Sequence, residues 1–178
     1  MNIKSLVCCG FFAALISVTA WIAVPLAVPF TLQTFGVFCA LLMLGGKLGT
    51  IAIMVYVLLG AIGLPVCAGF QGGTGVIFSP LGGFILGFVV MGLLYYLITK
   101  VCGNKTHTQL IALMVGILSC YTTGTLWFTL FSDNIDFKSA VTSCVLPFII
   151  PDAIKLWLAF IVSRKIEQAN IFTDKKTT

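Results

Sequence analysis

Apolar runs recur along nearly the whole of this chain, and they constrain its fold more than any other feature. The chain has 178 residues, 60% of them hydrophobic, and its mean hydropathy is +1.14. A soluble domain has a polar surface to fill and seldom reaches such values. Six runs have the composition of membrane-spanning helices. They cover about residues 6–24, 33–45, 48–63, 81–100, 108–131 and 141–163. The sequence therefore predicts an all-α integral membrane protein, with six transmembrane helices in one domain, 1–178.

The second and third runs are shorter than the roughly 20 residues that a full span needs. They are separated only by Gly-Gly-Lys, so they are either two short helices or one long broken helix.

The basic residues indicate an even number of spans. With six spans, one side holds Lys4, Lys47, Lys100, Lys105, Arg164, Lys165, Lys175 and Lys176. The other side then holds only Lys138 between helices, with Asp133 and Asp136 beside it. Five spans would remove this asymmetry.

Basic residues collect on the cytoplasmic side of membrane proteins. We therefore expect a multi-pass protein of the cytoplasmic membrane, with both termini and the tail 164–178 in the cytoplasm. The net charge of +5 does not indicate a nucleic-acid partner, because the basic residues lie in short connectors between apolar runs. The lipid bilayer is the partner that this pattern indicates.

The residues that catalysis or metal binding would need are scarce. Lys47 is followed by Leu48 rather than by Ser or Thr, so GGKLGT is not a phosphate-binding loop. There is no HExxH motif and no Ser–His–Asp set. The seven cysteines are scattered without a CxxC pair, and His107 is the only histidine. We expect no enzymatic activity, no metal site, no cofactor and no ATP hydrolysis by this chain itself.

Two connectors on the outer side lack the charges of an ordinary solvated loop. VPLAVPFTLQTF (24–35) has two prolines, and GLPVCAGFQGGTGVIFSPLGGF (63–84) is rich in glycine. We expect both to pack back over the mouth of the helix bundle as caps. Free backbone N–H and C=O groups at Gly73 and Gly83 could then bind a polar ligand. The alternative is an apolar re-entrant loop without a ligand.

The sixth run contains two charged residues, although charged residues make up only 8% of the chain. Asp152 and Lys155 are three residues apart and so share one helix face. An ionisable group in the middle of a span costs roughly 3 kcal/mol, so such groups face the bundle interior and have a partner. Pro151 either starts this helix or, together with Pro147, kinks a helix that began earlier. The pair is either an internal salt bridge that holds helices in register or part of a ligand site.

Further polar and aromatic side chains could converge on the same cavity. The first connector supplies Thr31, Gln33 and Thr34, and the second supplies Gln71. The fifth run adds Tyr121, Thr122, Thr123, Thr125 and Trp127. Each of these residues could instead make an interhelical hydrogen bond or lie at the membrane interface.

The first run has small residues four apart, at Gly10 and Ala14 and at Ala13 and Ser17. This spacing lets another helix approach closely. The partner helix is either part of this chain or part of another membrane protein.

Three long stretches resemble the BioY family, the biotin-binding S components of energy-coupling factor (ECF) transporters. They are VPFTLQTFGVFCALLMLGGKLG, YVLLGAIGLPVCAGFQGGTGVIFSPLGGFILGF and VLPFIIPDAIK, and the resemblance covers roughly residues 10–160. One departure follows the glycine-rich loop, where the family usually reads Gly-Pro-Thr-Gly-Gly-Tyr. This sequence reads Ser79-Pro80-Leu81-Gly82-Gly83-Phe84 and so lacks two hydroxyl groups.

The resemblance implies an S-component fold of six helices with capping outer loops, which binds biotin from outside with high affinity. The alternatives are an S component for a different vitamin or small molecule, or an intramembrane enzyme. It implies a separate transmembrane coupling protein and a pair of cytoplasmic ATPase subunits as partners, which hydrolyse ATP. By resemblance, Asp152 and Lys155 contact biotin, and Gly10, Ala13, Ala14 and Ser17 face the coupling protein. The full predicted binding set is Asp152, Lys155, Gln33, Thr34, Gln71, Gly73, Gly83, Tyr121 and Trp127. Lys155 could meet either the ureido carbonyl or the valerate carboxylate of biotin.

Overall fold

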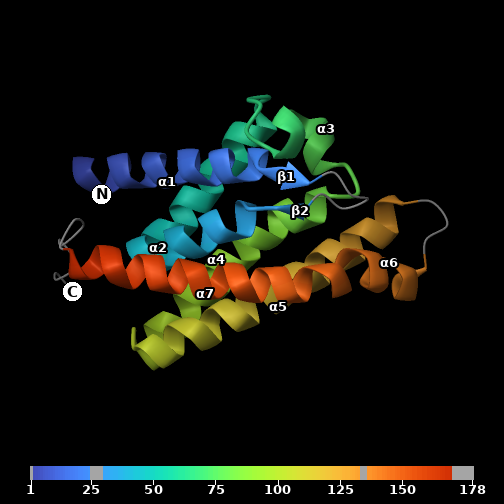
Figure 1. Ribbon diagram of the computed structural model, residues 1–178. Coiled ribbons are helices and arrows are strands. Elements are labelled where there is room, and N and C mark those ends of the chain that lie inside the picture. The colour runs from blue at the N-terminus through green and yellow to red at the C-terminus, as the bar shows by residue number, and fades with distance from the viewer. Residues whose placement is uncertain (1, 25–29, 133–135, 170–178) are drawn as a thin grey trace.

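The computed structural model describes residues 2–24, 30–132 and 136–169, and they form a bundle of long helices (Figure 1). Asp133, Lys175, Lys176 and parts of the first connector and the tail therefore lie outside the described residues. The long helices are α1 (Ile3–Trp21), α2 (Gln33–Ala61), α4 (Gly82–Cys102), α5 (Thr106–Phe131) and α7 (Leu146–Gln168). The shorter elements are β1 (Ala23–Val24), β2 (Phe30–Thr31), the 3-10 helix η1 (Ala68–Phe70), α3 (Thr74–Ile77) and α6 (Phe137–Cys144).

Five helical stretches of the described chain are long and apolar enough to cross a membrane: α1, α2, α4, α5 and the pair α6–α7. This count is lower than the predicted six because α2 contains both the second and the third apolar run. The prediction of six helices is nevertheless confirmed, since α2 consists of two helices that fold back on each other.

The fold-back of α2 occurs at Gly45, whose backbone is non-helical with φ 78° and ψ 174°. Residues with a Cβ rarely adopt such a positive φ, so glycine is required at this position. Gln33 Nε2 donates to Tyr56 Oη at 2.9 Å, although 23 residues separate the two. In a straight helix they would lie about 35 Å apart. The two arms, 33–44 and 46–61, are therefore antiparallel neighbours, and they replace the predicted bounds 33–45 and 48–63.

The two predicted alternatives for the proline residues are also resolved. α6 and α7 meet at Val145, and α7 begins at Leu146. Pro147 therefore lies in the first turn of α7, where a missing N–H costs nothing, and Pro151 lies inside the helix. The helix that carries Asp152 thus begins before Pro151 rather than at it.

The arms of α2 form the centre of the bundle. The helix α1 packs on α2, α4 packs on both α2 and α5, and α7 packs on α2. Figure 1 shows the first arm of α2 lying between α1 and α7. The side chains of Val37, Phe38, Leu41 and Ile53 are fully buried there.

The start of α1 and the end of α7 lie at one end of the bundle, which we call the termini end (Figure 1). The hairpin of β1 and β2, the short helix α3 and the start of α7 lie at the opposite end, the loop end. Both ends of the described chain are thus on one side, as an even number of spans requires. The short elements β1, β2, α3 and α6 all lie at the loop end (Figure 1).

Candidate ligand-binding site

A cavity of about 460 Å³ lies at the loop end of the bundle. This volume is within the usual range of small-molecule sites, and the wall is mainly apolar with a few polar groups. Its apolar wall includes Trp21, Val76, Leu81, Phe84, Phe88, Ile117 and Phe148. Its polar wall includes Thr31, Gln33, Thr34, Gln71, Ser79, Tyr121, Asp152 and Lys155. Six of the nine predicted binding residues are therefore brought together: Asp152, Lys155, Gln33, Thr34, Gln71 and Tyr121.

The charged pair of α7 lies in the wall of this cavity and is almost completely withdrawn from solvent. Lys155 Nζ and Asp152 Oδ1 are 2.8 Å apart, and the two side chains are 5% and 6% exposed. Their i,i+3 spacing puts both on the face of α7 that packs toward α2. The two charges compensate each other, which limits the cost of keeping them in a low-dielectric interior.

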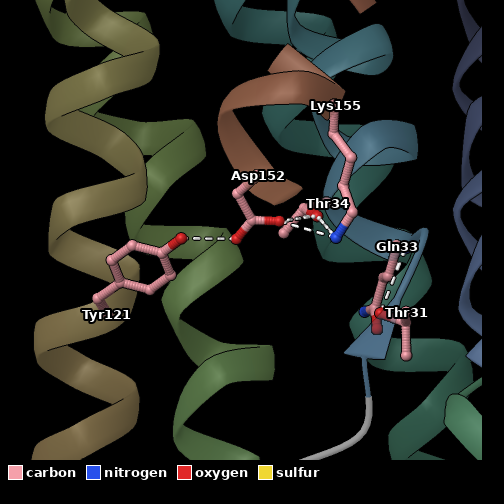
Figure 2. Close-up of polar contacts among 6 residues, drawn as sticks. All are labelled: Thr31, Gln33, Thr34, Tyr121, Asp152 and Lys155. Atoms are coloured by element: carbon pink, nitrogen blue, oxygen red, sulfur yellow. Dashed lines mark hydrogen bonds and ion pairs between the residues drawn. The ribbon is translucent and has the colours of Figure 1, made fainter. Parts of the chain in front are cut away.

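Side chains from two other helices complete a polar cluster around this pair (Figure 2). Thr34 of α2 donates its hydroxyl to Asp152 Oδ1 at 2.9 Å, and Lys155 Nζ lies 3.1 Å from the same hydroxyl oxygen. Tyr121 of α5 donates its hydroxyl to Asp152 Oδ2 at 2.7 Å. Both carboxylate oxygens therefore have a donor within the protein. Oδ1 accepts from both Thr34 and Lys155, whereas Oδ2 accepts only from Tyr121 and can accept one further hydrogen bond, so the cluster is organised in advance but has capacity for a ligand.

Phe30 of β2 is a contact of this cluster that sequence reasoning missed. The Lys155 ammonium lies 4.2 Å from the centroid of the Phe30 ring, within the range of a cation–π interaction. The Phe30 ring also stacks on Phe148, with 6.2 Å between the ring centroids. Phe30 directly precedes Thr31, a predicted candidate, in the uncharged first connector. This position was the only indication in the sequence that Phe30 could belong to the site. The contact of Phe30 with Lys155 could not be predicted from the sequence.

Gln33 connects the cavity to the centre of the bundle. Its side-chain amide donates to the hydroxyl of Tyr56, which is fully buried. Its backbone N–H donates to Thr31 Oγ1 at 3.3 Å, as Figure 2 shows. The first of these bonds leaves the Gln33 carbonyl oxygen as a polar group for the cavity wall. Gln71 reaches the same cavity from the second connector.

Three predicted binding residues do not line the cavity. Trp127 donates its indole N–H to the Ser79 carbonyl at 3.1 Å, and its ring stacks on Phe131. A Cβ at Gly83 would collide with Trp127, so this glycine permits close packing of α4 against α5. The N–H of Gly73 donates to the Gly60 carbonyl at 2.7 Å and is therefore already used. These residues support the wall from behind.

The small residues of α1 divide between two faces. Ala13 and Ser17 are buried within the chain, and Ser17 Oγ donates to the Ala13 carbonyl. Gly10 and Ala14 are exposed instead. Ala13 and Ser17 therefore pack inside this chain, whereas Gly10 and Ala14 lie on its surface.

The described residues contain no group of three or more His, Cys, Asp or Glu side chains placed to hold a metal ion. The polar cluster instead offers one anion, one cation and two hydroxyls around an apolar volume. Such an arrangement can bind a mainly apolar molecule that carries both hydrogen-bond donors and acceptors.

Comparison with known proteins gives the family. The model of the BioY family matches residues 1–171. The chain belongs to the BioY family. Among the similar proteins, the biotin transporter BioY of Thermotoga maritima is 38% identical over 94% of this chain and 98% of its own length. The biotin transporter BioY2 of Lactococcus lactis is 36% identical over 99% of this chain and 97% of its own length.

The fold of this BioY family member is also found in a crystal structure. That structure is the S-component for biotin from an ECF-type ABC transporter, with a TM-score of 0.83 and 28% identity. The match covers 93% of this chain and 92% of that chain. The fold predicted from the sequence, a helical membrane protein of the S-component type, is thereby confirmed.

The two residues that differ from the family pattern, Leu81 and Phe84, lie in the cavity wall. The two missing hydroxyls are therefore replaced by apolar surface. The Phe84 ring occupies the space that a Cβ at Gly124 would need, which fixes the ring against α5. This BioY family member therefore has a less polar wall on the α4 side than the pattern implies.

Proposed function

We propose that this chain binds biotin in the cavity at its loop end and serves as the substrate-specificity subunit for biotin uptake. Membership of the BioY family, the names of its relatives and the fold of the biotin S-component support this proposal. The single observation that carries it is the buried cluster of Asp152, Lys155, Thr34 and Tyr121 in the wall of an apolar cavity.

The chemistry of biotin fits this cluster. Its ureido ring has two N–H donors and one carbonyl acceptor, while its sulfur ring and aliphatic chain are apolar. We assign Asp152 Oδ2 as an acceptor for a ureido N–H group, and Lys155 as a donor to the carbonyl or to the valerate carboxylate. The apolar wall of Phe84, Phe88 and Phe148 then receives the sulfur ring.

The energy for uptake comes, in this proposal, from other subunits. We propose a transmembrane coupling protein and two cytoplasmic ATPase subunits as partners, because the structural neighbour belongs to an ECF-type ABC transporter. The chain itself would bind its ligand without catalysing a reaction and without a cofactor. Its place is the cytoplasmic membrane, with both termini in the cytoplasm.

Gly10 and Ala14 on the exposed face of α1 are the residues that we propose for docking to the coupling protein. Ala14→Trp should block assembly with that protein and leave biotin binding intact, because Ala14 lies outside the cavity. Co-purification with the coupling protein would measure the first effect. Normal assembly of Ala14→Trp would exclude this face, whereas Ala13→Trp should damage the fold because Ala13 is 1% exposed.

Equilibrium binding tests the proposed ligand. The purified protein in detergent should bind biotin saturably at micromolar concentration or below. Desthiobiotin, which keeps the ureido ring and lacks the sulfur, should still bind. Lipoate, thiamine and riboflavin should not compete. Absence of saturable biotin binding, or equal competition by lipoate, would reject the proposal.

A further inference from the structure

Asp152 can meet only one of the two ureido N–H groups of biotin. Its Oδ2 accepts from Tyr121 and can accept one further hydrogen bond, whereas its Oδ1 already accepts from Thr34 and Lys155. A second N–H group that entered the cavity without an acceptor would lose its hydrogen bond to water and weaken binding. The cavity wall therefore needs another acceptor close to the charged pair.

Gln33 has an acceptor oxygen that is not used. It directly precedes Thr34 on α2 and lines the same cavity, so it lies next to the polar cluster. Among the described residues, its hydrogen bonds are made by the backbone N–H and by Nε2, and nothing donates to Oε1. The enclosed side-chain atoms without a partner in this part of the chain are Tyr95 Oη and Thr125 Oγ1. Gln33 Oε1 is not one of them, so it borders the open space of the cavity.

The other polar side chains of the wall are less suitable as acceptors. Thr31 Oγ1 accepts from the Gln33 backbone N–H at 3.3 Å, and Ser79 Oγ donates to the Val76 carbonyl at 2.6 Å. Gln71 is exposed, so water competes for its amide group. Gln33 is 6% exposed and therefore provides an acceptor that is shielded from water.

Tyr56 fixes the direction in which this acceptor points. A free amide side chain can turn about its last torsion and present its NH₂ group in place of its oxygen. Gln33 Nε2 donates to Tyr56 Oη at 2.9 Å, and Tyr56 is 0% exposed and does not line the cavity. The amide nitrogen is thereby kept on the side of the bundle centre, and the amide oxygen is kept on the cavity side.

The Tyr56 hydroxyl is itself oriented by the second connector. A tyrosine hydroxyl has one proton, so it accepts from Gln33 best when that proton is directed to another neighbour. The Cys67 thiol is within hydrogen-bonding reach of this hydroxyl. Its sulfur lies over Gly60, one helical turn after Tyr56, only 3.1 Å from the position that a Cβ of Gly60 would take. A chain of polar contacts thus runs from Cys67 through Tyr56 to Gln33.

The polar groups of the wall match one edge of a cyclic urea. In the view of Figure 2, the Lys155 ammonium lies between the Asp152 carboxylate and Gln33. Lys155 Nζ uses two of its three N–H donors, for Asp152 and Thr34, so one remains for a ligand. In this order the wall offers an acceptor, a donor and an acceptor. A cyclic urea offers N–H, C=O and N–H along one edge, which is the complementary pattern.

We propose that Tyr56 is a positioning residue for ligand binding, which holds Gln33 Oε1 as the second acceptor, so that the wall recognises both N–H groups and the carbonyl of a cyclic urea. The identity of the ligand rests on the proposed function, whereas the orientation of Gln33 by Tyr56 does not. A ring with a single N–H group leaves one of the two acceptors without a donor, so it should bind more weakly than biotin.

Removal of the Tyr56 hydroxyl tests this role. Tyr56→Phe keeps the buried ring but frees the Gln33 amide, so the purified full chain in detergent should bind biotin about tenfold more weakly in isothermal titration calorimetry. Tyr95→Phe is the matched control, because Tyr95 is also 0% exposed and its hydroxyl has no partner among the described residues. This control should bind biotin as tightly as the wild type.

An analogue of biotin separates positioning from a general loss of structure. In a cyclic carbamate, an oxygen atom replaces one ureido N–H group. The isomer that directs this oxygen at Gln33 Oε1 brings two acceptors together, so the wild type should bind it about a hundredfold more weakly than biotin. In Tyr56→Phe the Gln33 amide can turn and donate to the oxygen, so the ratio should fall to about tenfold or less. A purely structural loss would weaken both ligands equally and leave the ratio unchanged.

A double variant shows whether Tyr56 acts through Gln33. Gln33→Leu should weaken biotin binding at least about tenfold, and adding Tyr56→Phe should cause no further loss. Additive losses, or an unchanged ratio of biotin to carbamate affinity in Tyr56→Phe, would overturn the role of Tyr56 and leave the proposed function intact. Absence of biotin binding by the wild type would reject the proposed function and the role of Tyr56 with it.

Discussion

Two ion pairs on α7 have the same spacing in the sequence but opposite surroundings. Lys155 and Asp152 are 2.8 Å apart with side chains 5% and 6% exposed, and Arg164 and Glu167 are 2.9 Å apart with side chains 32% and 50% exposed. Both pairs are i,i+3 pairs, so the helix alone brings each together. Spacing therefore predicts proximity, and only the packing around a pair decides whether it can serve a ligand.

The neighbours of the two pairs differ in the same way. The pair at the loop end is joined by Thr34 and Tyr121 and borders the cavity. At the termini end, Arg164 donates to Thr106 Oγ1 at 2.7 Å and to Gln109 Oε1 at 3.0 Å, which ties the end of α7 to the start of α5. We interpret the first pair as a binding group and the second as a brace between helices.

Breaking the buried pair should have the largest effect. Asp152→Asn or Lys155→Met leaves one buried charge without its partner, which we expect to lower the free energy of unfolding by about 3 kcal/mol. Each change should also weaken biotin binding by roughly a hundredfold or more. Thermal unfolding and biotin titration measure the two effects. Asp136→Asn and Lys138→Met, at exposed positions of similar charge, are the matched controls.

The double variant Asp152→Asn/Lys155→Met sharpens this result. It removes both charges, so it should be more stable than either single variant although it still fails to bind biotin. If the loss of stability in the double variant equalled the sum of the losses in the two single variants, the charges of Asp152 and Lys155 would not compensate each other in the folded protein.

Removal of the Tyr121 hydroxyl should have the next largest effect. Tyr121→Phe loses a hydrogen bond of 2.7 Å to a carboxylate but keeps the ring in the wall. We expect biotin to bind about tenfold more weakly, which corresponds to roughly 1.5 kcal/mol. Isothermal titration calorimetry would measure this loss of affinity. Tyr96→Phe, on α4 outside the cavity lining, is the control. If Tyr121→Phe bound biotin as tightly as the wild type, the Tyr121 hydroxyl would not contribute to the binding site.

Phe30 provides a smaller test of the same cluster. Phe30→Leu keeps an apolar side chain in contact with Phe148 but removes the ring that faces the Lys155 ammonium. Loss of a cation–π contact should cost about 1 kcal/mol and weaken biotin binding about fivefold. Phe30→Tyr should restore most of the affinity, because a phenol ring also attracts a cation. No recovery in Phe30→Tyr would argue against the cation–π contact.

The exposed pair should give the smallest effect. Glu167→Gln keeps the shape of the side chain but removes its charge next to Arg164. An exposed i,i+3 pair contributes less than about 0.5 kcal/mol, and salt weakens it further. We expect a shift in unfolding temperature near the limit of detection and unchanged biotin binding. Weaker biotin binding by this variant would contradict the division between the two pairs.

Much of the fold and the polar cluster could be predicted because the membrane leaves few alternatives. Long apolar runs must be helices there, and a buried charge must face inward and find a partner. These two rules predicted that Asp152 and Lys155 face the bundle interior, and they made Thr34 and Tyr121 two of several candidates for the same cavity. They concern the type of residue and its position in an apolar run, which the sequence records directly.

The parts that could not be predicted depend on distances across the bundle. Gly83 and Trp127 pack against each other, and the sequence offers no sign that a glycine serves helix contact rather than ligand contact. Ala13 and Ala14 are neighbours in the sequence, but only the packing of α1 on α2 buries one and exposes the other. Phe30 contacts Lys155 and Phe148 of α7 because β2 pairs with β1 at this position, which the sequence does not reveal.

The turn at Gly45 also sets how far the ligand must travel into the bilayer. The arm 33–44 is about 18 Å long, whereas the hydrocarbon core of a bilayer is about 30 Å thick. If exposed Lys47, next to the turn, lies at one membrane boundary, then Gln33 and Thr34 lie roughly 12 Å below the other. Biotin would therefore be held at a level where lipid tails, rather than water, surround the protein, and the connectors must extend down into the membrane to enclose it.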